Sequence, residues 1–229
     1  MLPEKIASGL PLEDDGWTAW GTKLKNFTQW RKRVWDNSPA ADKAQSYAIN
    51  LKEQFVDFTG LKDSSRKIID IGCGDGGIRK MLGTCRYYGV DPLLLENHDY
   101  DFNIVKGVGE HLPFADGYFD EAILNQVLDH CNSIDKLLEE TVRVIGKNGS
   151  INVMQYISEP EGLFANTYNI LLRVYLSVKK VKPLDTKMRH FNAEGLLSFF
   201  RDRFENVRFL KYSNYQFFIR ASVWKKGPR

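Results

Sequence analysis

A glycine-rich run is the part of the sequence whose residue types are best suited to holding a ligand. The run from Asp70 to Gly77 (DIGCGDGG) follows apolar residues and precedes Ile78, Met81 and Leu82, whose spacing is typical of one helix face. Glycines let the backbone turn sharply and approach a ligand without a Cβ in the way. The start of a helix beyond the glycines would offer free N–H groups to a carboxylate or a phosphate.

Two carboxylates beside this loop discriminate between the cofactors that it could hold. Gly72, Gly74 and Gly77 also satisfy the loose Gly-x-Gly-x-x-Gly pattern of dinucleotide-binding sites. Asp91 ends the next apolar segment, where a carboxylate suits the ribose hydroxyls of either cofactor class. Asp70, however, would repel a pyrophosphate and attract a cofactor that carries an ammonium and a sulfonium. The residues therefore favour S-adenosylmethionine over a dinucleotide or a plain glycine turn.

Two histidines are candidates for proton transfer. His130 follows a predicted strand at the edge where ligands bind in open α/β sheets, so it could take a proton from an acceptor. The alternative is a local hydrogen bond near the start of the helix at Ser133. His190 precedes another helical pattern and is a rival base or acceptor contact, with capping or packing as its alternative. We expect His111 to be a surface neighbour, and His98 has no informative context.

The elements that must position these residues alternate between strands and helices. Short apolar runs separated by helical patterns predict a mainly parallel sheet with helices on both faces. The predicted strands lie near residues 68–71, 87–90, 102–105, 122–124 and 151–154. Residues 209–212 and 216–224 are joined by so short a link that an antiparallel hairpin is expected. The predicted fold is a Rossmann-like α/β domain with a seven-stranded, mostly parallel sheet.

The sequence predicts a single domain over residues 1–229. Its parts are a helical cap (1–62), a cofactor-binding core (63–157), a substrate-side insertion or lid (158–190) and a C-terminal helix and hairpin (191–229). The cap contains Trp17, Trp20, Trp30 and Trp35, and the insertion contains an aromatic stripe followed by Lys179, Lys180 and Lys182. These lysines, with Arg189, either favour an anionic acceptor or form a solvated face.

Composition narrows the class of protein. The formal net charge of +3 is smaller than the clustered excess of Lys and Arg that is typical of nucleic-acid binders. Cys73, Cys85 and Cys131 cannot all pair and have no Cys-x-x-Cys spacing, so we expect reduced thiols and no metal site. No signal-peptide pattern is visible, and no stretch approaches the ~20 apolar residues that span a bilayer. We therefore expect a soluble, cytoplasmic protein without a membrane span.

Several segments together resemble the class I S-adenosylmethionine-dependent methyltransferases, over about residues 67–154. The acid-x-Gly-x-Gly-x-Gly signature is the run from Asp70 to Gly76. Residues Gly107–Phe114 are similar to the family's adenine loop, and Phe119-Asp120 to the opening of its fourth strand. Asn125–His130 matches the loop after that strand. The helix and turn before the fifth strand are matched by Glu140, Arg143-Val144-Ile145 and Gly149. The agreement in order and spacing makes this resemblance more specific than one glycine motif.

The resemblance implies a set of cofactor contacts. It places Asp70 and the glycines around the methionine portion and Asp91 on the ribose. The expected cofactor-binding residues are Asp70, Gly72, Cys73, Gly74, Asp91, Pro92, Val108, Gly109, Glu110, Asn125 and Gln126. Many relatives carry Asp where this chain has Val108, whose side chain cannot accept a hydrogen bond from the adenine amino group. A backbone contact from Gly109 is still expected.

The expected function is methyl transfer to oxygen or nitrogen of a small-molecule acceptor. DNA base methylation is disfavoured because Asn125 is followed by Gln126-Val127 rather than by paired prolines and an aromatic residue. RNA methylation, transfer of another group and ligand binding without catalysis stay open as alternatives, although the intact Asp70 and Asp91 argue against the last. A homo-oligomer is compatible with the sequence.

Overall fold

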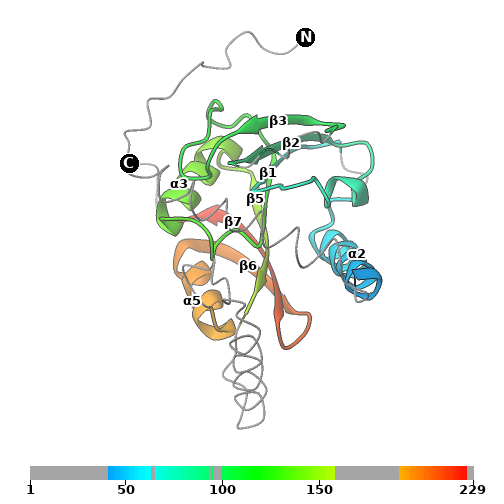
Figure 1. Ribbon diagram of the computed structural model, residues 1–229. Helices are drawn as coiled ribbons and strands as arrows, with labels where there is room; N and C mark the ends of the chain where they lie inside the picture. The colour runs from blue at the N-terminus through cyan, green and yellow to red at the C-terminus, as the bar shows by residue number, and fades with distance from the viewer. Residues whose placement is uncertain (1–40, 63–64, 93, 95–98, 158–190, 226–229) are drawn as a thin grey trace, which may run out of the picture.

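A seven-stranded sheet forms the centre of the protein in the computed structural model, which describes residues 41–62, 65–92, 94, 99–157 and 191–225. The strand order is β3-β2-β1-β4-β5-β7-β6 (Figure 1). The strands are β1 Lys67–Ile71, β2 Arg86–Asp91, β3 Asn103–Lys106, β4 Glu121–Asn125, β5 Ser150–Tyr156, β6 Phe204–Lys211 and β7 Gln216–Trp224. The first five pair in parallel, and β7 pairs antiparallel with both β5 and β6. The predicted fold class is confirmed. The first hairpin strand begins earlier than expected, directly after α5.

Helices cover both faces of this sheet (Figure 1). The helix α2 (Ala41–Thr59) packs on one face, and α3 (Ile134–Ile145) and α5 (Ala193–Arg203) pack on the other. Both α3 and α5 begin with a side-chain cap: Ser133 Oγ accepts from the amide of Lys136, and Asn192 Oδ1 accepts from that of Gly195. Of the predicted cap, only residues 41–62 are described. The insertion at 158–190 lies outside the described residues.

Alternation along the strands produces two buried layers. Ile69 and Ile71 of β1 point into the core beneath α3 and α5, whereas Ile68 points into the core beneath α2. Asp70 shares the face of Ile68, because successive side chains of a strand point to opposite faces. None of the helices in the described part of the chain combines the length and the hydropathy of a membrane span.

The segment after the glycine run differs from expectation. The spacing of Ile78, Met81 and Leu82 predicts a helix, but the structure has only a three-residue 3₁₀ turn, η1 (Arg79–Met81). Ile78 and Leu82 are nevertheless buried against the core beneath α2. Glycines bound the segment on both sides, at Gly77 and Gly83, which leaves too few residues to repay the cost of nucleating an α-helix.

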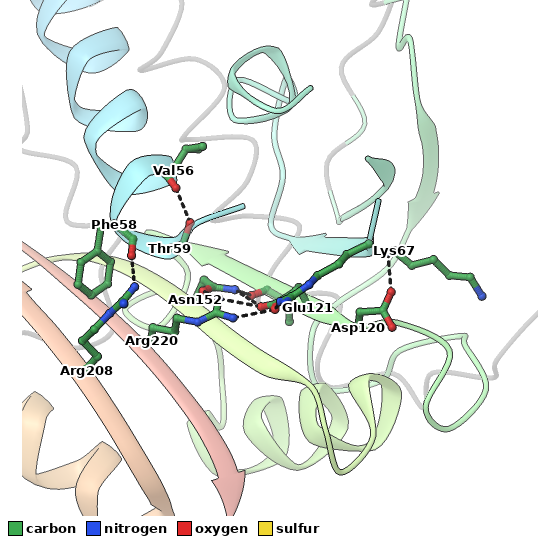
Figure 2. Close-up of polar contacts among 11 residues, drawn as sticks. Val56, Phe58, Thr59, Lys67, Asp120, Glu121, Asn152, Arg208 and Arg220 are labelled. Atoms are coloured by element: carbon green, nitrogen blue, oxygen red, sulfur yellow. Dashed lines mark hydrogen bonds and ion pairs between the residues drawn. The ribbon is translucent and has the colours of Figure 1, made fainter. Parts of the chain in front are cut away.

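A buried ionic cluster stabilises the sheet at the opposite end of its parallel strands from the glycine run. Glu121 begins β4 and is 1% exposed. Its carboxylate accepts hydrogen bonds from Arg66, Arg220 and Asn152, the last at 2.8 Å. Figure 2 shows Glu121, Asn152 and Arg220 directed toward one another. Burial lowers the pKa of Arg220.

Candidate functional site

The glycine loop after β1 takes a conformation that favours glycine at three positions. Gly72, Gly74 and Gly76 have φ angles of +73°, +56° and +72°. A Cβ on Gly72 would lie 2.6 Å from Cγ2 of Val127. The amide of Gly72 donates to the carbonyl of Val90 over 2.7 Å, so the loop is fastened to the end of β2. The loop therefore presents backbone rather than side chains at the carboxyl edge of the parallel strands.

Asp91 ends β2 beside this loop and is buried. Its Oδ2 accepts a hydrogen bond from the amide of Gly74 over 2.8 Å. An ionised carboxylate has about four acceptor positions, so further donors such as a pair of ribose hydroxyls can be accommodated. Pro92, which follows directly, is half-buried.

Asp70 lies in β1 and is 1% exposed. The Tyr87 hydroxyl donates to its Oδ2, while its Oδ1 is buried without a hydrogen-bond partner among the described residues. Burial raises the pKa of Asp70 to about 7, and the nearby Asp91 adds to the rise. The Tyr87 hydrogen bond and the positive charge of Lys52 oppose it. A buried acceptor oxygen without a donor is suited to a ligand that brings one.

Asn125 and Gln126, at the end of β4, have different environments. Asn125 Oδ1 is a second buried oxygen without a partner in the described part of the chain, and it lies on the same face as Asp70 because Asp70 pairs with Ile123. The Gln126 side chain instead donates to Gln216 Oε1 and accepts from the amide of Tyr156. Both ends of the Gln126 amide are thus used in holding β5 and β7.

The predicted adenine segment lies after β3. A Cβ on Gly109 would lie 2.3 Å from Cδ1 of Leu137, so α3 packs directly on its backbone. Val108 is half-buried, and its carbonyl accepts from the amide of His111. The buried Glu110 carboxylate accepts from the amide of Asn132 over 2.6 Å. Glu110 therefore fastens this segment to the start of α3.

His130 is the predicted base that the structure describes. Its side chain is 31% exposed, and its Nε2 lies 3.8 Å from Oδ1 of the buried Asp129. The carboxylate of Asp129 is suited to orient the imidazole and to stabilise its protonated form. His111 is exposed. His98 and His190 lie outside the described residues.

Residues that sequence reasoning missed also contribute. Tyr87 donates to Asp70 from the neighbouring strand, a contact that depends on strand register. Asp129 could have been found from its position next to His130. Cys73, which was expected to contact cofactor, is buried, and burial raises the pKa of its thiol. The thiol is therefore kept neutral at physiological pH.

The described groups fit S-adenosylmethionine. The Oδ1 atoms of Asp70 and Asn125, which have no partner among the described residues, could accept from an ammonium group, and Asp91 could accept from a ribose diol. The backbone at Gly72 can approach a ligand closely. A pyrophosphate would meet Asp70 and Asp91 with like charge. The arrangement thus favours a cationic nucleoside over a dinucleotide.

Comparison with known proteins agrees with this geometry. Residues 69–153 match the family model described as a methyltransferase domain. The chain is 27% identical over 114 residues to sterol 24-C-methyltransferase of Schizosaccharomyces pombe, covering 43% of this chain and 29% of that protein. It is 21% identical over 133 residues to norajmaline N-methyltransferase of Rauvolfia serpentina, covering 49% of this chain and 45% of that protein. The chain thus spans less than half the length of each of these curated relatives.

The fold is shared with solved methyltransferase structures. One is 1,6-didemethyltoxoflavin-N1-methyltransferase of Burkholderia thailandensis, with bound 1,6-didemethyltoxoflavin and S-adenosylhomocysteine. Its TM-score is 0.59 at 14% identity, over 94% of this chain and 93% of that one. Residues 69–153, which match the family model, contain the glycine loop, Asp91, the adenine segment and His130. Residues 69–153 thus match a methyltransferase domain, and the described fold is similar to that of solved methyltransferases.

Proposed function

We propose that the chain catalyses S-adenosylmethionine-dependent methyl transfer to an oxygen or nitrogen atom of a small-molecule acceptor. The observation that carries this proposal is the placement of Asp70 and Asp91 on adjacent strands around a loop of positive-φ glycines. The Gly74–Asp91 hydrogen bond holds loop and strand together. These groups complement the positive charge of the cofactor's ammonium and the hydroxyl donors of its ribose.

The bound cofactor supplies an electrophilic methyl group: the acceptor's lone pair forms the new bond as the carbon–sulfur bond breaks, and S-adenosylhomocysteine leaves. For such an in-line displacement, the protein's contribution is chiefly alignment and exclusion of water. Asp70, Asn125 and Asp91 would fix the cofactor at both ends. The edge of the sheet near Asn125 and Tyr156 would then face the acceptor, in keeping with ligand placement in open α/β sheets.

A protonated acceptor needs a base, and His130 is the proposed group. Its Nε2 faces Asp129 Oδ1 at 3.8 Å, so the proton from an acceptor hydroxyl or ammonium would be taken at Nδ1. The Asp129 carboxylate would stabilise the imidazolium that results. His190, with Arg189, is kept as the rival base or acceptor contact.

The acceptor class rests on the relatives and on the surface next to the site. The printed names of three similar proteins refer to a sterol, norajmaline and 1,6-didemethyltoxoflavin, all small molecules. In this chain, the rings of Tyr156 and Tyr215 are stacked at 5.8 Å where β5 meets β7. Tyr215 is exposed. An aromatic surface of this kind suits an acceptor with a flat or apolar part.

The test has a binding stage and a turnover stage. Calorimetry should detect binding of S-adenosylmethionine and of S-adenosylhomocysteine, and no binding of a nicotinamide dinucleotide. Formation of S-adenosylhomocysteine should then be measured by mass spectrometry with pools of phenols, amines, carboxylic acids and RNA. Turnover in a small-molecule pool is expected. Tight binding of the dinucleotide alone would falsify the cofactor assignment, and turnover only with RNA would replace the acceptor class.

A further inference from the structure

The loop that should hold the cofactor's carboxylate lacks the helix that the sequence led us to expect there. A long helix after the glycines would offer several free N–H groups and a partial positive charge to an anion. The structure has instead the 3₁₀ turn Arg79–Met81. A turn of this length has few aligned peptide dipoles. The turn therefore offers little positive charge to the negative end of the methionine portion.

Lys52 of α2 places such a charge on the loop. A Cβ built on Gly77 would lie 2.1 Å from Lys52 Nζ, so the ammonium occupies the space that this glycine leaves open. Asp75 Oδ1 is 3.2 Å from the same Cβ position. The charge of Lys52 also acts on Asp70, whose pKa it lowers. Lys52 is half-buried, which limits the alternative positions of its side chain.

Two features beside the loop have opposite electrostatic character. The Oδ1 atoms of Asp70 and Asn125 are buried acceptors without a partner in the described part of the chain. Lys52 Nζ, at Gly77, is a donor with a full positive charge. An α-amino acid group carries an ammonium and a carboxylate on one carbon. A loop that has both buried acceptors and a cation beside it complements such a zwitterion.

We propose that Lys52 binds the carboxylate of the cofactor's methionine portion and thereby positions the cofactor on the loop. This inference rests on the proposed function, because it requires that cofactor. The competing role for Lys52 is a structural counter-charge for Asp70 and Asp75. The two roles differ in one measurable respect: only carboxylate binding makes the effect of Lys52 depend on the presence of a carboxylate in the ligand.

The experiment compares two ligands that differ only in that carboxylate, S-adenosylhomocysteine and its decarboxylated amine analogue. Dissociation constants are measured by calorimetry for the wild type, Lys52→Met and Lys52→Arg. Lys62→Met is the matched control, because Lys62 is an exposed lysine beyond the end of α2. Lys52→Met should weaken S-adenosylhomocysteine by about 10- to 100-fold, the value of one charge-assisted hydrogen bond. It should leave the analogue within about threefold of wild type, because the analogue has no carboxylate for Lys52 to bind.

A second variant displaces the ammonium without removing its charge. Gly77→Ala places a methyl group where Lys52 Nζ lies, so it should also weaken S-adenosylhomocysteine selectively. Lys52→Arg and Lys62→Met should keep the preference for the carboxylate ligand. Thermal unfolding of each variant reports whether it folds. If Lys52→Met does not fold, Gly77→Ala provides the test of the proposal.

The outcomes separate this inference from the proposed function. Equal weakening of both ligands by Lys52→Met, or no weakening of either, would overturn the role of Lys52 and leave the cofactor assignment intact. Failure of the wild type to bind S-adenosylhomocysteine would overturn the proposed function, and the role of Lys52 with it. Selective loss of the carboxylate ligand supports both.

Discussion

The amide of Gly74 donates to Asp91 Oδ2 over 2.8 Å, and this contact joins the loop after β1 to the carboxyl end of β2. Asp91 is therefore both a proposed ribose ligand and a fastening for the loop that is proposed to hold the methionine portion. The two halves of the cofactor site share one carboxylate. A substitution of Asp91 should therefore affect both halves of the proposed site.

Asp91→Ala should weaken S-adenosylmethionine binding by roughly 2–4 kcal/mol, since it removes charge-assisted hydrogen bonds to the ribose and the acceptor for Gly74. Calorimetry with the wild type and the variant measures this directly. Asp91→Asn, which keeps an acceptor oxygen, should lose less than the alanine variant. Unchanged affinity in a folded Asp91→Ala protein would remove Asp91 from the cofactor site.

The raised pKa of Asp70, about 7, predicts a pH-dependent stability. Below its ordinary pKa of 3.8 the carboxyl is protonated in both folded and unfolded chains and costs nothing. As the pH rises to about 7, only the unfolded chain ionises, so the fold is progressively destabilised, by at most about 4 kcal/mol above pH 7. The free energy of unfolding of Asp70→Asn, minus that of the wild type, should therefore increase from pH 4 to pH 8.

Cofactor binding should show the opposite preference at the same group. An ammonium beside Asp70 Oδ1 stabilises the carboxylate, so affinity for S-adenosylmethionine should rise with pH up to about 7, where the pKa of Asp70 lies, and then level off. Asp70→Asn should flatten this profile. Tyr87→Phe, which removes the hydroxyl that lowers the pKa of Asp70, should move the rise to higher pH.

His130→Ala tests catalysis separately from binding. If His130 takes the acceptor's proton, turnover should fall roughly 10²–10⁴-fold while cofactor affinity stays near wild type. His111→Ala is the matched control, because His111 is exposed and its side chain is not part of the proposed chemistry. A loss of only a few-fold in His130→Ala would exclude His130 as the base and leave either His190 or alignment of an acceptor that is already nucleophilic.

Glu121→Ala should lower the free energy of unfolding and leave cofactor affinity unchanged. Its removal leaves Arg66 and Arg220 without their shared carboxylate, and breaking a buried pair in this way costs about 3–5 kcal/mol. Chemical denaturation measures the loss. Asp116→Ala is the comparison, because Asp116 pairs with Arg143 but is 81% exposed, so its loss should cost no more than about 1 kcal/mol. An equal loss of unfolding free energy in both variants would contradict the expectation that the buried ion pair contributes more to stability than the exposed one.

The sheet was predictable because its strands are short apolar runs that end in distinctive residues. The glycines and Asp91 follow strands whose carboxyl ends meet, so their proximity followed from the alternation of strands and helices. The hairpin of β6 and β7 followed from the short link between them. Its first strand was placed too late, since residues 204–208 alternate weakly and follow the helix α5 without a turn signal.

Other contacts depend on packing between distant segments and leave no local pattern. Lys52 reaches the loop only because α2 packs on the same face as Asp70. Glu110, a predicted cofactor contact, also accepts from the amide of Asn132, because the adenine segment packs against the start of α3. The expected helix after Gly77 had the right apolar spacing for burial, but its flanking glycines shorten it to one turn.

The position of β7 affects how the protein can be synthesised. Among the described strands it is last in sequence, yet it lies between β5 and β6 in the sheet (Figure 1). A nascent chain that has completed β6 but not β7 therefore has an unpaired backbone edge on β5, at residues such as Val153 and Met154. Ribosomes add residues slowly compared with the collapse of a chain. The edge of β5 therefore stays open until β7 has been synthesised, which makes β7 the strand that closes this part of the sheet.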